Sequence, residues 1–158
     1  MKLLISFILL SCLSQLAYSQ DLMAERIRQI SGKKRSVYFD SGIFHNGGPK
    51  LSSKVKAMRH SYSESLGYER IVIDFTTNEI PRVYGYISNQ HKKIFLDLFN
   101  TEVPASVGSF GSSKFVQKVD FFPIEADSVS LEMKFKSNVN VDIFYLEKPG
   151  RLVIDIKS

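Results

Sequence analysis

The sequence contains one cysteine, Cys12, and it lies in an N-terminal segment that predicts a removable export signal. A basic start is followed by an apolar run over residues 3–10, and Ala17-Tyr18-Ser19 places small residues at the two positions that a signal peptidase reads. Cleavage before Gln20 is therefore expected, with residues 1–19 as the signal peptide. The run is well short of the roughly 20 residues of a membrane-spanning helix, so no transmembrane anchor is expected in the mature protein.

Removal of this signal also removes the cysteine, so the mature chain is expected to hold no disulfide and no thiol nucleophile. The alternative is a lipoprotein signal, because Leu9-Leu10-Ser11-Cys12 loosely fits the pattern that ends in a lipid-modified cysteine. A cysteine-free exported chain with this kind of leader is expected in the periplasm.

Catalytic and metal-binding motifs are also missing from the sequence. The three histidines lie in different segments without metal-ligand spacing, and no serine occupies a Gly-x-Ser-x-Gly turn. Three aspartates have basic residues in the same segment and are interpreted as structural. We therefore expect no enzyme, no metal and no cofactor. The three histidines are His45, His60 and His91, and the three aspartates are Asp74, Asp97 and Asp155.

The chain is mildly basic, with 21 Lys and Arg against 16 Asp and Glu and a formal net charge of +5. Such a balance favours an acidic polymer such as cell wall, or anionic lipid. Nucleic acid is not expected as a target because the chain is predicted to be exported. The one basic run, residues 33–35, is interpreted as a solvated turn.

Helical periodicity is nowhere sustained, and alternation typical of strands dominates from residue 54 onward. Residues 20–53 are interpreted as a flexible arm, in which residues 21–30 could form one short amphipathic helix and residues 41–53 form a loop rich in Gly, Ser, Asn and Pro. Residues 54–158 hold short segments rich in Val, Ile, Phe and Tyr with turn residues between them. They predict an all-β domain.

The predicted strands form two copies of a four-stranded unit, joined by a linker over residues 103–113. The expected fold is two similar four-stranded sheets packed as a sandwich. The first copy comprises residues 54–60, 68–76, 82–88 and 93–98, and the second comprises 115–122, 128–136, 139–145 and 151–156.

One six-residue motif, called here the repeated phrase, occurs three times. It consists of a basic residue, three apolar residues, an Asp and a further apolar residue. Its copies begin at Arg70, Lys93 and Arg151. Strand side chains alternate between faces, so one face of each phrase is apolar core and the other carries a charge near each end. That second face is either a ligand surface, in which Arg151 and Asp155 take part, or a solvated face with cross-strand ion pairs.

The phrase over residues 145–156, Tyr-Leu-Glu-Lys-Pro-Gly-Arg-Leu-Val-Ile-Asp-Ile, together with the related segment from Arg70, resembles the AMIN domain. That family occurs at the start of periplasmic N-acetylmuramoyl-L-alanine amidases and in pilus secretins, and is described as two symmetry-related four-stranded sheets. The resemblance covers residues 54–158, without an amidase domain or secretin channel. It implies peptidoglycan binding in the cell envelope.

The best candidate for a ligand surface is the row Arg82, Tyr84 and Tyr86, because Val83 and Ile87 face the other way. Tyrosine rings can cover the C–H face of a sugar and a guanidinium can bind a carboxylate. The same tyrosines could instead pack against the sheet or the arm. Two functions follow as hypotheses: a non-catalytic peptidoglycan-binding module, or a protein-interaction component of an envelope assembly that uses a sheet edge or the arm.

Overall fold

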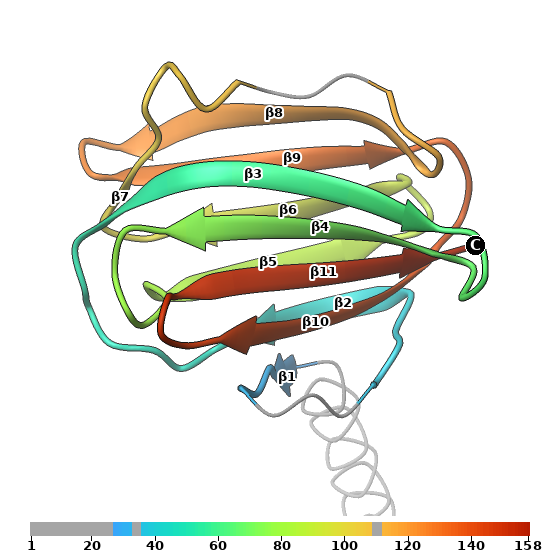
Figure 1. The fold of residues 1–158 in the computed structure, drawn as a ribbon, viewed down its shortest axis with the longest axis horizontal. Coiled ribbons are helices and arrows are strands. Elements are labelled where there is room, and N and C mark those ends of the chain that lie inside the picture. The colour runs from blue at the N-terminus through green and yellow to red at the C-terminus, as the bar shows by residue number, and fades with distance from the viewer. Residues whose placement is uncertain (1–26, 33–35, 109–111) are drawn as a thin grey trace, which may run out of the picture.

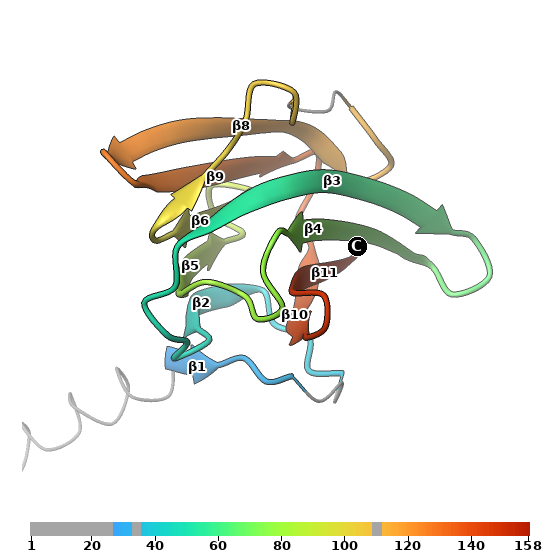
Figure 2. The same ribbon diagram turned by 60° about the vertical axis from the view of Figure 1, so that its left-hand side comes forward.

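The computed structural model describes residues 27–32, 36–108 and 112–158, which form strands and no helix. The strands form two mixed sheets that lie one over the other (Figures 1 and 2). The six-stranded sheet has the order β1 (Ile27–Gln29), β2 (Ser41–His45), β5 (Val83–Ser88), β6 (Lys93–Leu98), β9 (Ser128–Phe135) and β8 (Val116–Glu125). The five-stranded sheet has the order β10 (Asn140–Leu146), β11 (Arg151–Lys157), β4 (Tyr68–Phe75), β3 (Ser53–Ser63) and β7 (Thr101–Glu102).

The all-β fold is thus confirmed, and each of the eight predicted strands exists. The number of strands per sheet was wrong, because β1, β2 and β7 extend the sheets to six and five. All neighbours pair antiparallel except β1 with β2 and β3 with β7.

The inner faces of the two sheets share one hydrophobic core. Alternation along β4 buries Ile71, Ile73 and Phe75, and alternation along β11 buries Leu152 and Ile154 in the same cluster. Ile73 and Ile154 have no exposed surface, so the core face of the repeated phrase was predicted correctly. Full burial of an aliphatic side chain contributes about 1.5 to 3 kcal/mol, so this core is the main source of hydrophobic stabilisation in the described residues.

The two copies are present, but they do not form one sheet each. The first copy places β3 and β4 in the five-stranded sheet and β5 and β6 in the six-stranded sheet. The second copy does the reverse, with β8 and β9 in the six-stranded sheet and β10 and β11 in the five-stranded one. Each sheet therefore contains the same four-strand order, β5-β6-β9-β8 and β10-β11-β4-β3, in which strands of both copies are neighbours. The residue pairing between neighbouring strands therefore identifies which positions of the two copies are equivalent.

The described residues of the predicted arm, 27–32 and 36–53, are part of the fold. The loop expected over residues 41–53 was wrong for Ser41–His45, which form β2 beside β5. Phe44 lies opposite Gly85, and a Cβ at Gly85 would come within 2.1 Å of the Phe44 ring. The missing side chain therefore makes the space that Phe44 fills. Phe39 pairs with Val141 of β10 in an isolated bridge, so the segment contacts both sheets along one side.

The helix expected over residues 21–30 was wrong for Ile27–Gln29, which form β1, and residues 21–26 lie outside the described part. Ile30 is buried in the core cluster and donates its backbone N–H to the carbonyl of His45 at 2.8 Å. The predicted cleavage site, Cys12 and the basic run at 33–35 also lie outside the described residues. No helix in the described part of the chain is long and apolar enough to cross a membrane.

Candidate binding surface

Tyr84 and Tyr86 lie on the outer face of the six-stranded sheet, as the alternation of β5 predicts. Val83, Gly85 and Ile87 point into the core, while each tyrosine is 42% exposed. Tyr84 lies opposite Asp97 of β6, and Tyr86 lies opposite Phe95 of the same strand. The two rings therefore stand side by side in solvent on a regular strand.

Further apolar side chains extend this surface on both sides of Tyr86. Ile43 of β2 and Phe95 of β6 are its direct cross-strand neighbours, and Ile27 of β1 lies next to Ile43. Ile27 is 52% exposed, and Ile43 and Phe95 are half-buried. Neighbouring strands are about 4.8 Å apart, so the row spans the length of about three strand spacings. We call the surface formed by Ile27, Ile43, Tyr84, Tyr86 and Phe95 the tyrosine face.

Arg82 borders the tyrosine face just before β5 begins. Its Nε donates to the carbonyl of Gly48 at 3.4 Å, and its side chain is otherwise exposed. The backbone around it is fixed by the buried Asn46, whose Oδ1 accepts the N–H of Val83 at 2.9 Å and whose Nδ2 donates to the carbonyl of Pro81 at 2.8 Å. The predicted row Arg82, Tyr84 and Tyr86 is therefore held on one accessible face.

The other two predicted residues, Arg151 and Asp155, lie on the outer face of the five-stranded sheet. Asp155 is 1% exposed and accepts two hydrogen bonds from Arg70, at 2.6 Å from Nε and 2.7 Å from Nη2. Arg151 Nε lies 3.3 Å from Asp74 Oδ1, and Arg59 binds the same carboxylate with bonds of 2.6 and 2.8 Å. We call this surface, formed by Arg59, Arg70, Asp74, Arg151 and Asp155, the arginine face.

The side chains around the arginine face strengthen these ion pairs. The hydrogen bonds to Asp155 raise the pKa of Arg70 above its usual value, and the hydrogen bonds to Asp74 do the same for Arg59. The guanidinium carbon of Arg70 lies 5.1 Å from the ring centroid of Tyr68 and 5.8 Å from that of Phe144. An arginine that forms a bidentate ion pair and also stacks on aromatic rings is held in one geometry. We therefore interpret the arginine face as a structural network of ion pairs.

The two faces point in opposite directions, so the structure does not bring the five predicted residues together. Sequence reasoning missed Ile43, because β2 was not predicted, and it did not join Phe95 to the tyrosines, because strand neighbours are not adjacent in sequence. It also missed Arg59 and Arg70 as partners of the aspartates. The repeated phrase carried the signal for Arg70, since its Arg and Asp lie four residues apart in both β4 and β11.

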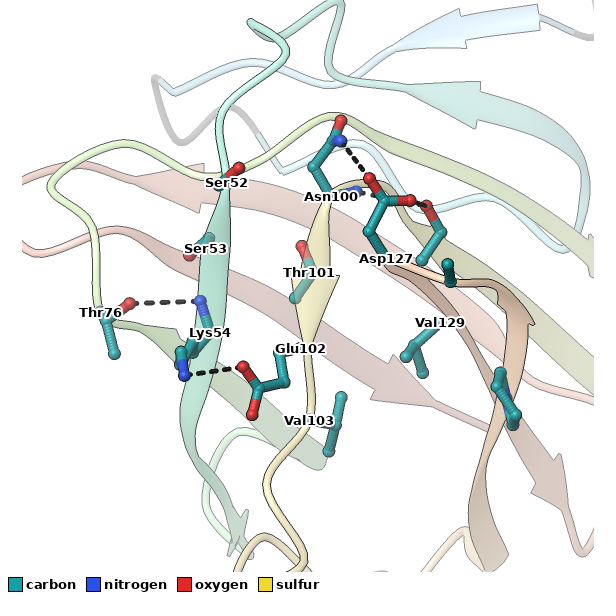
Figure 3. Close-up of a pocket in the computed structure, with 13 residues that line it drawn as sticks. Ser52, Ser53, Lys54, Thr76, Asn100, Thr101, Glu102, Val103, Asp127 and Val129 are labelled. Atoms are coloured by element: carbon teal, nitrogen blue, oxygen red, sulfur yellow. Dashed lines mark hydrogen bonds and ion pairs between the residues drawn. The ribbon is translucent and has the colours of Figure 1, made fainter.

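A cavity of about 780 Å³ lies where β3, β7 and the β8–β9 turn meet (Figure 3). Its charged side chains are already paired. Lys54 Nζ lies 2.7 Å from Glu102 Oε2, and Asn100 donates to Asp127 Oδ2 at 2.8 Å. These partners leave no charged group aimed into the cavity, so we do not place the binding function there.

In the part of the chain that the structure describes, no group of three or more His, Cys, Asp or Glu side chains could hold a metal ion. Comparison of the chain with family models, with characterised proteins and with solved structures found no match. The candidate surface is therefore argued from its own geometry.

Proposed function

We propose that the protein is an exported, non-catalytic module that binds peptidoglycan through the tyrosine face and acts in the periplasm. The observation that carries the proposal is the exposure of Tyr84 and Tyr86 on the outer face of the sheet, with Ile43 and Phe95 beside Tyr86. Contiguous apolar side chains on a surface mark interaction sites. Tyrosine rings suit sugars, because each ring covers C–H groups while its hydroxyl stays in water.

The order of the strands gives the proposal independent support. Two four-strand units of the same order, with the Arg-Leu-Val-Ile-Asp phrase on β11, agree with the description of AMIN domains as two symmetry-related four-stranded sheets. In our proposal the units form a sandwich to which β1, β2 and β7 are additions. Peptidoglycan is the ligand that the resemblance implies.

Co-sedimentation of the mature chain with purified sacculi tests this function. The wild type should pellet, and Tyr84→Ala and Tyr86→Ala should each weaken binding by about 5- to 30-fold, the effect of losing one buried contact of 1 to 2 kcal/mol. The melting temperature should hardly change, since exposed side chains contribute little to folding. Arg82→Lys should also weaken binding, because lysine lacks the planar fork of arginine.

A matched control is Leu66→Ala, which removes an apolar side chain that is 61% exposed in the β3–β4 turn of the other sheet. It should pellet like the wild type. Unfolding of the tyrosine variants, or undiminished pelleting, would mean that the tyrosines are ordinary sheet packing and that the arginine face must be tested next.

The alternative function is that of a protein-interaction component in an envelope assembly. The edge of β3 favours it, because β7 pairs only with Ser53 and Lys54 and the remaining edge of this long strand has no strand partner in the described residues. A peptide could add to such an edge by main-chain hydrogen bonds. A component of this kind should stay in the supernatant with sacculi and pellet only after its protein partner is added.

Export has its own test, since the leader lies outside the described residues. We expect envelope-purified protein to begin at Gln20 without lipid. Intact mass decides the point, and a diacylglycerol adduct on Cys12 would contradict it.

A further inference from the structure

Three lysines lie in one row on the outer face of the six-stranded sheet. Lys134 of β9 is paired directly with Lys93 of β6 on one side and with Lys118 of β8 on the other. Neighbouring strands are about 4.8 Å apart, so the ammonium groups project from a line of roughly 10 Å. We call these three residues the lysine row.

The lysine row is unfavourable for folding. Like charges directly opposite each other on neighbouring strands destabilise a sheet. Two of the three are partly neutralised by carboxylates in the next row, since Lys93 Nζ lies 2.7 Å from Glu132 and Lys118 Nζ lies 2.9 Å from Asp120. Lys134 is exposed, and no ion pair or hydrogen bond of its side chain is found within the described part of the chain.

The other sheet shows that the fold does not require this arrangement. The position equivalent to Lys93 is Arg151, and the position equivalent to Lys134 is Asp74. There the directly opposed side chains carry opposite charges, with Arg151 Nε 3.3 Å from Asp74 Oδ1. The same place in the fold thus holds a neutralising pair on one sheet and a repulsive pair on the other. Folding does not account for the repulsive pair.

The lysine row is continuous with the tyrosine face. Lys93 Nζ lies 5.7 Å from the centroid of the Phe95 ring, and Phe95 is the cross-strand neighbour of Tyr86. A molecule that lies on Tyr86 and Phe95 therefore meets Lys93 two residues along β6. The cross-strand neighbour of Phe95 on β9 is Glu132, and Lys134 lies two residues further along that strand, opposite Lys93.

We infer that the lysine row is an anion subsite of the tyrosine face and binds carboxylate groups carried by the glycan polymer. This inference rests on the proposed function and specifies its ligand as an acidic glycan, in which the peptide carboxylates provide the charge. A discrete carboxylate can reach Lys134 between Lys93 and Lys118. An anionic membrane surface would instead bring its headgroups over Glu132 and Asp120 as well, where they would be repelled.

The test uses sacculi in two forms, untreated and with their carboxyl groups converted to neutral amides. Lys134→Gln should reduce binding to untreated sacculi about fivefold, and Lys134→Glu about 30-fold. The binding of Lys134→Gln and wild type to amidated sacculi should be equal, and salt should weaken only the binding to untreated sacculi.

Lys134→Glu should also raise the melting temperature by about 1 to 4 °C, because it replaces two repulsive pairs with attractive ones. Loss of binding in a more stable protein cannot result from unfolding.

Lys56→Gln is the matched control, since Lys56 is an exposed lysine on β3 of the other sheet. It should bind both forms of sacculi like the wild type. Equal binding of wild type and Lys134→Gln to untreated sacculi would overturn the subsite while leaving wall binding intact. Failure of the wild type to pellet either form would overturn the proposed function and the subsite with it. Lysine-dependent binding to vesicles of phosphatidylglycerol and phosphatidylcholine, without such dependence on sacculi, would assign the row to a membrane instead.

Discussion

The outer faces of the two sheets occupy equivalent places in the internal repeat and have different chemistry. On the five-stranded sheet, Asp155 is buried and bound to Arg70, and Asp74 is shared by Arg59 and Arg151. On the six-stranded sheet, the position equivalent to Asp155 is Asp97, which lies opposite Tyr84 and Ser130 and not opposite an arginine. On the arginine face the charged side chains pair with one another, while the six-stranded sheet keeps exposed tyrosines and an exposed lysine, Lys134, that lies opposite two other lysines.

The Arg and Asp of the repeated phrase pair with each other across strands where two copies of the phrase are neighbours. On the five-stranded sheet β4 and β11 run antiparallel, so the Arg of each phrase lies opposite the Asp of the other, as Arg70 with Asp155 and Arg151 with Asp74. On the six-stranded sheet β6 carries the phrase but its neighbour β9 does not. We interpret the first face as structural and the second as free for a ligand.

The largest expected effects lie in the core and should be equal for both sheets. Ile154 of β11 and its equivalent on β6, Leu96, have no exposed surface. Truncation of either to Ala should lower the free energy of unfolding by about 2 to 5 kcal/mol, from lost burial and the cavity left behind. Denaturant unfolding measures both. A loss near zero at either site would mean that the two sheets do not share one core.

The next largest effect should separate the two outer faces. Arg70→Met removes the guanidinium that donates two hydrogen bonds to the buried Asp155. We expect a loss of about 2 to 3 kcal/mol in the free energy of unfolding, somewhat below that of a fully buried pair because Arg70 keeps some exposure. Asp97→Asn, at the position of the other sheet that is equivalent to Asp155, should change stability by less than about 1 kcal/mol. Similar losses in the two variants would remove the distinction between a structural face and a free one.

The sequence alone predicted the eight strands of the repeat, and the inward and outward faces of the repeated phrase and of β5, because alternation is a local property. It did not predict β2, since Gly42, Gly47 and Gly48 give that segment the composition of a loop. Its strand pairing depends on Phe44 filling the space over Gly85, forty-one positions away in the sequence. The division of each copy between the sheets also depends on contacts between distant strands, so pairing between Arg70 and Asp155 was not visible in the sequence.

The smallest expected effect concerns alkaline pH and Tyr38, whose phenol is influenced by Asp155 of the arginine face. Partial burial raises the pKa of Tyr38, and the nearby Asp155 and Asp142 raise it further. A raised pKa means that the folded protein resists ionisation of this phenol, so stability is lost as pH rises above the ordinary value near 10. Tyr38→Phe should therefore lose less stability than the wild type between about pH 9 and 11. Parallel pH profiles of unfolding for the two proteins would show that Tyr38 does not contribute.

The most direct test of the account is to observe which face a soluble wall fragment contacts. A disaccharide–peptide released from sacculi by muramidase can be titrated into the mature protein while backbone amide signals are followed by nuclear magnetic resonance. We predict concentration-dependent shifts at Tyr84, Tyr86, Phe95 and Lys134, with the amides of β4 and β11 unchanged. Shifts confined to β4 and β11 would contradict it and would place the ligand on the arginine face.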